Sequence, residues 1–371
     1  MKIVAIKPFL ADRYLLVRVY TDQGLVGNGE AGLWAHHPMV RAAIRELSDY
    51  YIGKDPLSIE RHHQVVSRNT HFMGSVISAA ISAIDIALWD ILGKSVNLPV
   101  YQLLGGKCRE KVRVFANVLG NTLDQRAESA RQCVAQGFTS LRMTPFFSGW
   151  EGQNATRVIA TAVKMVDAVR QAVGDGVDLG LEIHRNLRPD ETIVLARELA
   201  PYRILYYEDP IPPENTDALK YVAQHVDIPL AAGERSYNMY QFKDLIDSKT
   251  VGMVRPDISL AGGFTQGRKI AALAEAAFVG VFPHLMGSPV NNAAFVQFAA
   301  AVPNYVVMES NAIEDSLSAI VDEPVRLESG YRIVPDRPGI GVEIVEDKLA
   351  EFPCKTRKID GNFHADGSVA N

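Results

Sequence analysis

The stretch Asp178-Leu-Gly-Leu-Glu182-Ile-His184 is the first of three short apolar segments that end at or near a glutamate, and the other two lead to Glu208 and Glu234. Successive glutamates are 26 residues apart, which is about the length of one strand, one helix and two short loops. Each glutamate therefore lies one βα unit from the next. In a parallel barrel such residues meet at the C-terminal ends of adjacent strands.

Three carboxylates placed together predict a metal site. Like charges repel unless a cation lies among them, and ligands that are all oxygen favour a hard divalent ion. We expect Glu182, Glu208 and Glu234 to bind Mg²⁺, which keeps positions open for water or substrate. The alternative is that each glutamate caps the helix that follows it. That reading fits any one of them but fits all three poorly.

Short apolar segments alternate with amphipathic helical patterns from residue 111 onward, which is typical of a parallel α/β barrel, a modified TIM barrel. Eight strands are predicted, and numbered around a ring they place the third and seventh on opposite walls. The predicted strands are Val112–Asn117, Ser140–Thr144, Asp178–His184, Leu205–Glu208, Pro229–Glu234, Met253–Asp257, Gly280–His284 and Tyr305–Glu309.

Two histidines fall at predicted strand ends. His184 follows Glu182 by two residues, so in extended chain both side chains point into the barrel mouth. His284 ends the seventh strand, and Asp257 on the sixth can orient its imidazole. A histidine is more often a structural residue, but the position of these two favours a catalytic role. Glu309, which ends the eighth strand, is a further candidate for hydrogen bonding or proton sharing.

Arg142 on the second predicted strand is a candidate for binding an anionic substrate, with a structural ion pair as the alternative. Two irregular segments in the N-terminal region, residues 32–37 and 68–74, are rich in groups that can touch a ligand. We interpret them as a substrate lid that contributes Trp34, His37 and Asn69, although ordinary surface loops have the same composition.

The first 31 residues alternate in apolar character and predict a β-meander, followed by three helical patterns. These give an α+β capping domain over residues 1–110, with the barrel over 111–315 and a C-terminal segment over 316–371 that returns to the cap. The most apolar segment, Val76 to Gly93, is interrupted by serine and aspartate and predicts a buried helix between the domains. The polar C-terminal end is interpreted as a tail or an oligomer contact.

Composition restricts the function. The chain has 371 residues, 47% hydrophobic content and a formal net charge of -5, enough for a large core and without the basic stripe of a nucleic-acid or anionic-membrane protein. Its three cysteines lack disulfide or metal-ligand spacing, and no signal peptide or membrane span is predicted. We expect a cytoplasmic homo-oligomer whose partner is a small molecule.

The motifs Trp89-Asp-Ile-Leu-Gly-Lys94, Glu208-Asp-Pro210, Ala232-Gly-Glu234-Arg and Arg255-Pro-Asp257 followed by Gly262-Gly263 resemble those of the enolase superfamily. The resemblance covers Met1 to about Gly341. The pairing of Asp257 with His284 is similar to the mandelate racemase subgroup, and the added His184 is similar to its galactonate dehydratase branch.

Three departures from that pattern matter. Glu182 stands where the branch usually has aspartate, which leaves the identity of the substrate open. Arg142-Met-Thr replaces the lysine pair of many relatives, as in the mannonate dehydratase branch, whose barrel-loop tyrosine has no placed equivalent here. Asp257 stands where muconate cycloisomerases have lysine. Lysine-based racemisation and cycloisomerisation are therefore disfavoured.

The resemblance implies a Mg²⁺-dependent dehydratase of an acid sugar such as galactonate. His284 with Asp257 would remove the proton alpha to the carboxylate, and His184 would protonate the departing β-hydroxyl, giving a 2-keto-3-deoxy sugar acid. One alternative is a racemase or epimerase that uses the same histidines, and product identity separates the two. The other is a barrel that binds without catalysis, which the complete set of acidic residues argues against.

Overall fold

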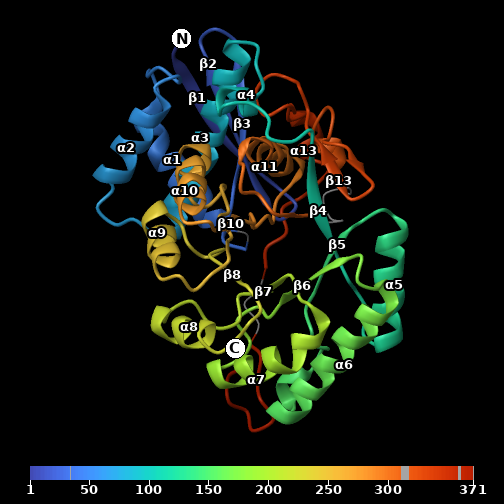
Figure 1. Ribbon diagram of the computed structural model, residues 1–371. Helices are drawn as coiled ribbons and strands as arrows, with labels where there is room; N and C mark the ends of the chain where they lie inside the picture. Colours follow the sequence, from blue (N-terminus) through green and yellow to red (C-terminus); the bar gives the residue numbers. More distant parts are fainter. Residues whose placement is uncertain (34, 311–316, 358–360, 371) are drawn as a thin grey trace.

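The computed structural model describes residues 1–33, 35–310, 317–357 and 361–370. Trp34 and the predicted boundary at residue 315 lie outside these ranges. The N-terminal region is a three-stranded antiparallel sheet followed by helices, which confirms the predicted meander (Figure 1). Its elements are β1 (Ile3–Ala11), β2 (Tyr14–Thr21), β3 (Val26–Ala31), α1 (His37–Tyr51), α2 (Ile59–Asn69), α3 (Ser75–Ser95) and α4 (Val100–Leu103).

Helix α3 is the core helix of the cap. It is long and apolar enough to cross a membrane, but 78% of its most apolar window is buried inside the protein. Two of its serines contact the barrel: Ser78 Oγ donates to Leu260 O at 2.7 Å and Ser82 Oγ accepts from Gly262 N at 2.7 Å. The prediction of a buried helix between the two regions is thus confirmed.

The described part of the larger region contains eight parallel strands, and they lie within or largely within the segments predicted from sequence. They are β4 (Lys111–Asn117), β5 (Ser140–Met143), β6 (Asp178–Glu182), β7 (Tyr206–Glu208), β8 (Leu230–Ala232), β9 (Met253–Val254), β10 (Gly280–Val281) and β11 (Met308–Glu309). Strands β4 to β10 pair in sequence order, and β11 pairs with β4. One further parallel bridge joins Val281 to Tyr305.

Helices cover the outside of this sheet (Figure 1). They are α5 (Leu123–Ala135), α6 (Ala155–Val173), α7 (Pro189–Leu199), α8 (Thr216–Ala223), α9 (Met239–Asp247), α10 (Gly263–Ala276) and α11 (Pro289–Ala301). The interior is filled by aromatic side chains, where Tyr206 packs on Phe282 with ring centroids 4.5 Å apart. Gly180 makes room for that tyrosine, since a Cβ there would lie 2.1 Å from its Cζ. The packed interior forms the floor of the site described below.

The C-terminal segment contacts both regions. Strand β12 (Leu327–Glu328) forms a hairpin with β13 (Tyr331–Ile333), and β13 pairs antiparallel with β4 of the barrel. Farther on, Glu346 at the start of α13 (Glu346–Leu349) binds Arg18 and Tyr20 of the cap sheet. Toward the C-terminus, His364 and Val369 line a cavity together with Arg188 and Glu191 at the start of α7, and this part of the chain can be followed in Figure 1.

Candidate active site

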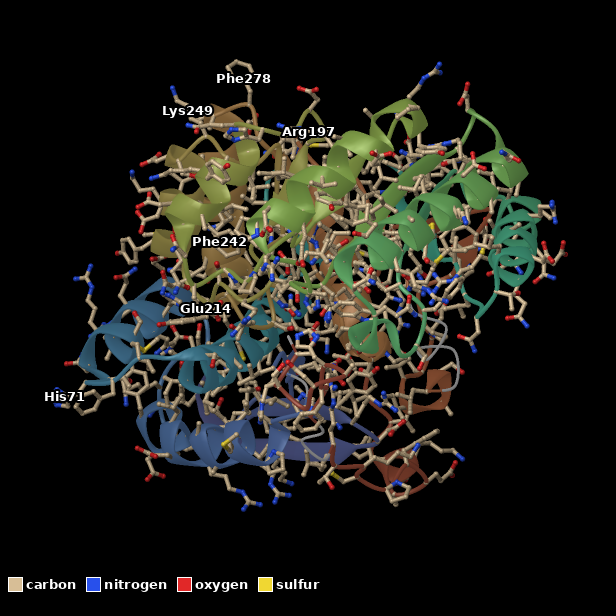
Figure 2. All side chains as sticks on the ribbon, turned by 90° about the horizontal axis from the view of Figure 1, so that it is seen from below. His71, Arg197, Glu214, Phe242, Lys249 and Phe278 are labelled. Carbon is tan, nitrogen blue, oxygen red and sulfur yellow. The ribbon has the colours of Figure 1, made fainter. Side chains whose placement is uncertain are left out.

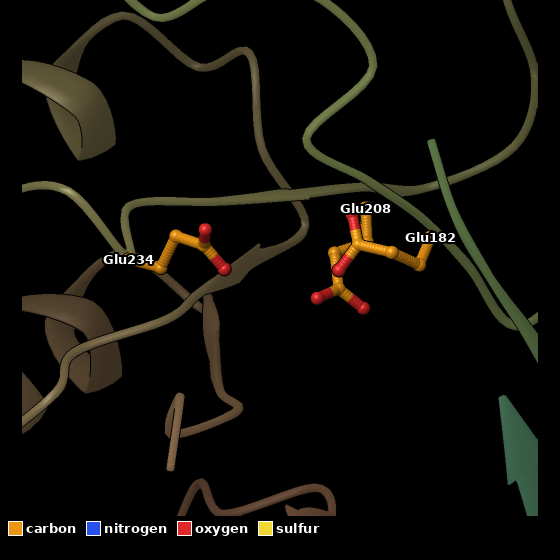
Figure 3. A group of neighbouring side chains, drawn as sticks. All are labelled: Glu182, Glu208 and Glu234. Carbon is orange, nitrogen blue, oxygen red and sulfur yellow. The ribbon is translucent and has the colours of Figure 1, made fainter. Parts of the chain in front are cut away.

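The three predicted metal ligands lie together. Glu182 and Glu208 are direct neighbours in the register of β6 and β7, and Glu234 follows β8 by two residues. One carboxylate oxygen from each lies within 4.8 Å of the others. Figure 3 shows Glu182 and Glu208 side by side, with the carboxylate of Glu234 turned toward them.

The chemistry of this group fits a divalent cation. Burial raises the pKa of Glu182 and of Glu208, because a charged carboxylate loses its hydration there. Glu208 Oε2 is buried, and no donor among the described residues reaches it. Three oxygen donors and an unsatisfied buried carboxylate oxygen are the features that Mg²⁺ or a similar hard ion would satisfy.

Arginines flank the carboxylates. Arg255 lies with Nη2 2.7 Å from Glu208 Oε1 and Nη1 2.6 Å from Glu234 Oε2, and Arg185 Nη1 is 2.5 Å from Glu234 Oε1. Burial alone would raise the pKa of Glu234, but nearby His284, Arg255 and Arg185 lower it well below its usual range. Glu234 is therefore held in its ionised form by these neighbouring positive charges.

Asp257 and His284 form a hydrogen-bonded pair. His284 Nδ1 donates to Asp257 Oδ2 at 2.9 Å, and the second carboxylate oxygen accepts from Ser259 N at 2.9 Å and from its Oγ at 2.5 Å. His284 Nε2 faces the metal ligands, 3.8 Å from Glu234 Oε2. Burial lowers the pKa of His284, but Glu234, Asp257 and Glu309 raise it to about 9.

A cavity of about 610 Å³ connects this pair to the cap. Asp257, His284 and Glu234 line one side, and residues from the cap line the other. The remaining lining residues are Leu33, His36, Met39, Ser75, Val76, Arg235, Tyr237 and Leu260. Its volume suits a small polar ligand.

His184 is placed differently from the sequence argument. Strand β6 ends at Glu182, and His184 and Arg185 have left-handed φ values of 56° and 65°. The premise of extended chain through His184 was therefore wrong. The backbone N–H of His184 donates to Glu182 Oε1 at 2.7 Å, while its side chain is exposed at the end of the strand. Loss of hydration on the side of the imidazole that faces the protein, together with the charge of Arg185, lowers its pKa.

The other predicted site residues divide between the barrel and the cap. Arg142 contacts carboxylates of the cluster and Glu309, which also accepts a long hydrogen bond of 3.5 Å from Leu285 N. In the cap, His37 is buried and its pKa is lowered to about 4 by burial. Asn69 is exposed and donates to Val65 O at 2.8 Å.

The second predicted lid segment points outward in part. His71 projects into solvent at the periphery of the molecule (Figure 2), while Ser75 and Val76 at the start of α3 line the cavity. His36 lies in the first predicted lid segment but was not named as a site residue, and sequence reasoning missed Tyr237 and Ser259. The only signals of these two residues were proximity in sequence to Glu234 and to Asp257 respectively.

Comparison with known proteins agrees with this architecture. Residues 3–105 match the model of the mandelate racemase / muconate lactonizing enzyme N-terminal domain, and residues 125–348 match the enolase C-terminal domain-like model. The chain is 35% identical to the D-galactonate dehydratase of Ralstonia pickettii over all of both proteins. It is 33% identical to that of Pectobacterium atrosepticum, covering 95% of this chain and 94% of the relative.

Solved structures give the same result. An enolase from Agrobacterium radiobacter, with Na and L-malate bound and an ordered active site, is 30% identical with a TM-score of 0.94 over 100% of each chain. A member of the enolase superfamily from Salmonella Typhimurium is 30% identical with a TM-score of 0.90, covering 95% of this chain and 98% of that one. The chain thus belongs to the mandelate racemase / muconate lactonizing enzyme family of the enolase superfamily, within its group of hydro-lyases, the acid sugar dehydratases.

Proposed function

We propose that this protein is a Mg²⁺-dependent hydro-lyase that dehydrates an aldonate such as galactonate, or a related acid sugar, to a 2-keto-3-deoxy sugar acid. The observation that carries the proposal is that a buried carboxylate triad and the Asp257–His284 pair meet at one cavity. The similarity to D-galactonate dehydratases over the whole chain supports the choice of substrate class.

Glu182, Glu208 and Glu234 would hold the Mg²⁺. When bound, the ion supplies the positive charge that stabilises the dianionic enediolate formed when a carboxylate substrate loses its alpha proton.

His284 is the proposed base. The bond to Asp257 fixes the proton on Nδ1, so Nε2 faces the cavity as the atom that accepts the alpha proton. Ser259 keeps the carboxylate in place from its other side. The negative charge of Glu234 raises the pKa of His284. Once that charge is neutralised, the pKa of His284 falls toward the range where the imidazole accepts a proton at neutral pH.

His184 is the proposed acid for the second step. Loss of the β-hydroxyl needs a proton, because hydroxide is a poor leaving group. The backbone N–H of His184 is bonded to a metal-ligand carboxylate, so the residue is fixed beside the cluster on a different strand end from His284. Its exposed side chain can turn toward a bound substrate.

We further propose that the enzyme works in the cytoplasm as a homo-oligomer. All three cysteines are free, and Cys108 and Cys354 are exposed, which suits a reducing compartment. Light scattering of the purified protein tests the oligomeric state.

In the decisive experiment, the protein is incubated with MgCl₂ and each member of a panel of aldonates and aldarates, and the formation of 2-keto acid is measured. We expect turnover with at least one acid sugar, loss of turnover after chelation, and recovery on adding Mg²⁺. Glu208→Gln should lose activity by about 10³-fold or more, because an amide weakens the ligand and unbalances the charge of the cluster. Full activity in exhaustively chelated protein would exclude the metal site, and inversion of the alpha carbon without loss of water would indicate an epimerase.

A further inference from the structure

Arg142 connects the candidate metal ligands to a fourth carboxylate. Its Nη1 donates to Glu208 Oε1 at 3.0 Å and lies 3.4 Å from Glu182 Oε2. Its Nη2 donates to Glu309 Oε1 at 2.7 Å, and its Nε donates to Asn117 Oδ1 at 3.1 Å. The guanidinium also lies 4.6 Å from the ring centroid of Phe115. Every nitrogen of the group therefore has a protein partner.

Two guanidinium groups share one oxygen of Glu208. Arg142 Nη1 and Arg255 Nη2 lie 3.0 Å and 2.7 Å from Oε1, while Oε2 is buried without a donor among the described residues. Two guanidinium contacts on Oε1 restrict rotation of the carboxylate and leave Oε2 as its oxygen without a donor. The arrangement selects which atom of Glu208 is available to a cation.

The same arginines also set the charge of the site. A guanidinium is always protonated, and in a poorly hydrated interior its charge acts strongly on a second cation a few ångströms away. A fixed positive charge beside Glu182 and Glu208 therefore opposes binding of a divalent ion to those glutamates. Glu309 favours binding of the cation, because its negative charge lies against Arg142 and offsets the charge of the guanidinium.

We infer that the fixed positive charge of Arg142 limits the affinity of the carboxylate triad for Mg²⁺, and that Arg142 does not bind the anionic substrate. The inference rests on the proposed metal site. Arg142 is a better residue to test than Arg255, since its side chain is 13% exposed while that of Arg255 is fully buried.

The test is isothermal titration of MgCl₂ into chelator-treated protein, with thermal unfolding of each variant measured in parallel. Arg142→Met removes the charge but keeps much of the volume, and we expect the Kd for Mg²⁺ to fall by about tenfold while the metal-free protein becomes less stable. Arg142→Lys keeps the charge and should stay close to the wild-type Kd. Glu309→Gln removes a nearby negative charge, and its Kd should rise.

Arg126→Met is the matched control. Arg126 is also buried in this part of the barrel, but it donates to the backbone carbonyls of Val118, Gly120, Thr144 and Phe146, and no carboxylate among the described residues accepts from it. Its loss should lower the melting temperature without changing the Kd. An unchanged or raised Kd in Arg142→Met, or a shift in the same direction in Arg142→Met and Glu309→Gln, would overturn the inference alone. Absence of Mg²⁺ binding to the wild-type protein would overturn the proposed metal site as well.

Discussion

Asp257 binds His284 through one carboxylate oxygen and Ser259 through the other. Asp257→Asn removes the negative charge beside His284 with little change in side-chain volume. The amide cannot stabilise the protonated imidazole or fix its tautomer in the same way. We expect the rate of keto-acid formation to fall by about 10³-fold, nearly as much as in His284→Asn. Initial rates at saturating substrate and Mg²⁺ measure this. Wild-type turnover in Asp257→Asn would show that the two residues are not a catalytic pair.

The two histidines should differ in a partial reaction. Enediolate formation needs a base and the metal, whereas loss of hydroxide without an acid adds several kcal/mol to a later barrier. His184→Asn should therefore lose dehydration yet still exchange the alpha hydrogen of the substrate with deuterated water.

His284→Asn should lose both reactions, and proton NMR of recovered substrate distinguishes the outcomes. Exchange retained in His284→Asn but lost in His184→Asn would reverse the two roles.

At the residue scale, the sequence located side chains that follow directly from strand ends and missed those that depend on backbone turns. The regular spacing of the three glutamates was sufficient to predict that they lie together in the structure. The left-handed φ values of Leu33 and Ala35 were not predictable, because neither residue favours that conformation. This loop places His36 on the cavity and leaves His37 buried, whereas the sequence analysis predicted that His37 contacts the substrate.

Strand β3 and helix α11 are joined by one buried carboxylate. Glu30 at the end of the cap sheet accepts from Ser288 N at 2.9 Å, from Ser288 Oγ at 2.6 Å and from Asn291 N at 3.0 Å. These donors lie at the N-terminus of the helix, where backbone N–H groups lack partners within the helix. Glu30 thus holds the cap against the barrel next to the loop that follows β10.

This carboxylate predicts a pH dependence of stability. Burial raises the pKa of Glu30 to about 7 from a usual value of 4.5, although its hydrogen bonds lower it. The folded state therefore binds the proton more tightly than the unfolded state. The contribution of Glu30 to stability is complete below about pH 4.5 and is lost as the pH rises to about 7, a change of about 3 kcal/mol.

Urea unfolding of the wild-type protein and of Glu30→Gln between pH 5 and pH 8 measures the effect. The wild-type free energy of unfolding should fall more steeply with pH than that of the variant. Glu128→Gln serves as the control, because Glu128 is exposed on α5, and it should keep the wild-type slope. Equal slopes for all three proteins would remove Glu30 as the cause.

At the element scale, the eight strands and the helices between them were predictable, but their ends were not. Strands β9 and β10 contain two residues each, whereas the predicted segments extend to Asp257 and His284. The predicted segments include Arg255-Pro-Asp257 and Phe282-Pro-His284, which follow the last strand residues and are buried except for the half-buried His284. Sequence pattern alone does not separate such a buried loop in a barrel mouth from the end of a buried strand.

The metal ligands come from three neighbouring strands, so Mg²⁺ should bind the folded chain and not the unfolded one. Saturating MgCl₂ should therefore raise the melting temperature of chelated protein by several degrees, corresponding to about 2–3 kcal/mol when the ion is present at roughly a hundred times its Kd. Differential scanning calorimetry measures the shift. Glu208→Gln should show little or none of it, and an equal shift in that variant would place the ion elsewhere.

For the whole molecule, motif spacing was enough to indicate the family, whereas the absence of a nucleic-acid partner, expected from composition and charge, stays a prediction. The C-terminal segment was predicted to return to the cap, but its pairing with the barrel was not predicted. The β12–β13 hairpin extends the barrel sheet at β4 before the chain reaches the cap at Arg18. A short polar hairpin can pair with either the barrel or the cap. The choice depends on residues distant in sequence, so the hairpin's own sequence carries no pattern that predicts it.

The contact between Arg142 and Glu309 also has a consequence for how the protein is made. The two residues are 167 positions apart, and at about 5–20 residues per second a ribosome needs roughly 10–30 s to synthesise the chain between them. During that interval the edge of β4 lacks its partner β11, and the charged cluster lacks one of its carboxylates. A nascent chain must keep these groups hydrated until the eighth strand emerges, so slow translation or a stall before residue 309 should favour aggregation over folding.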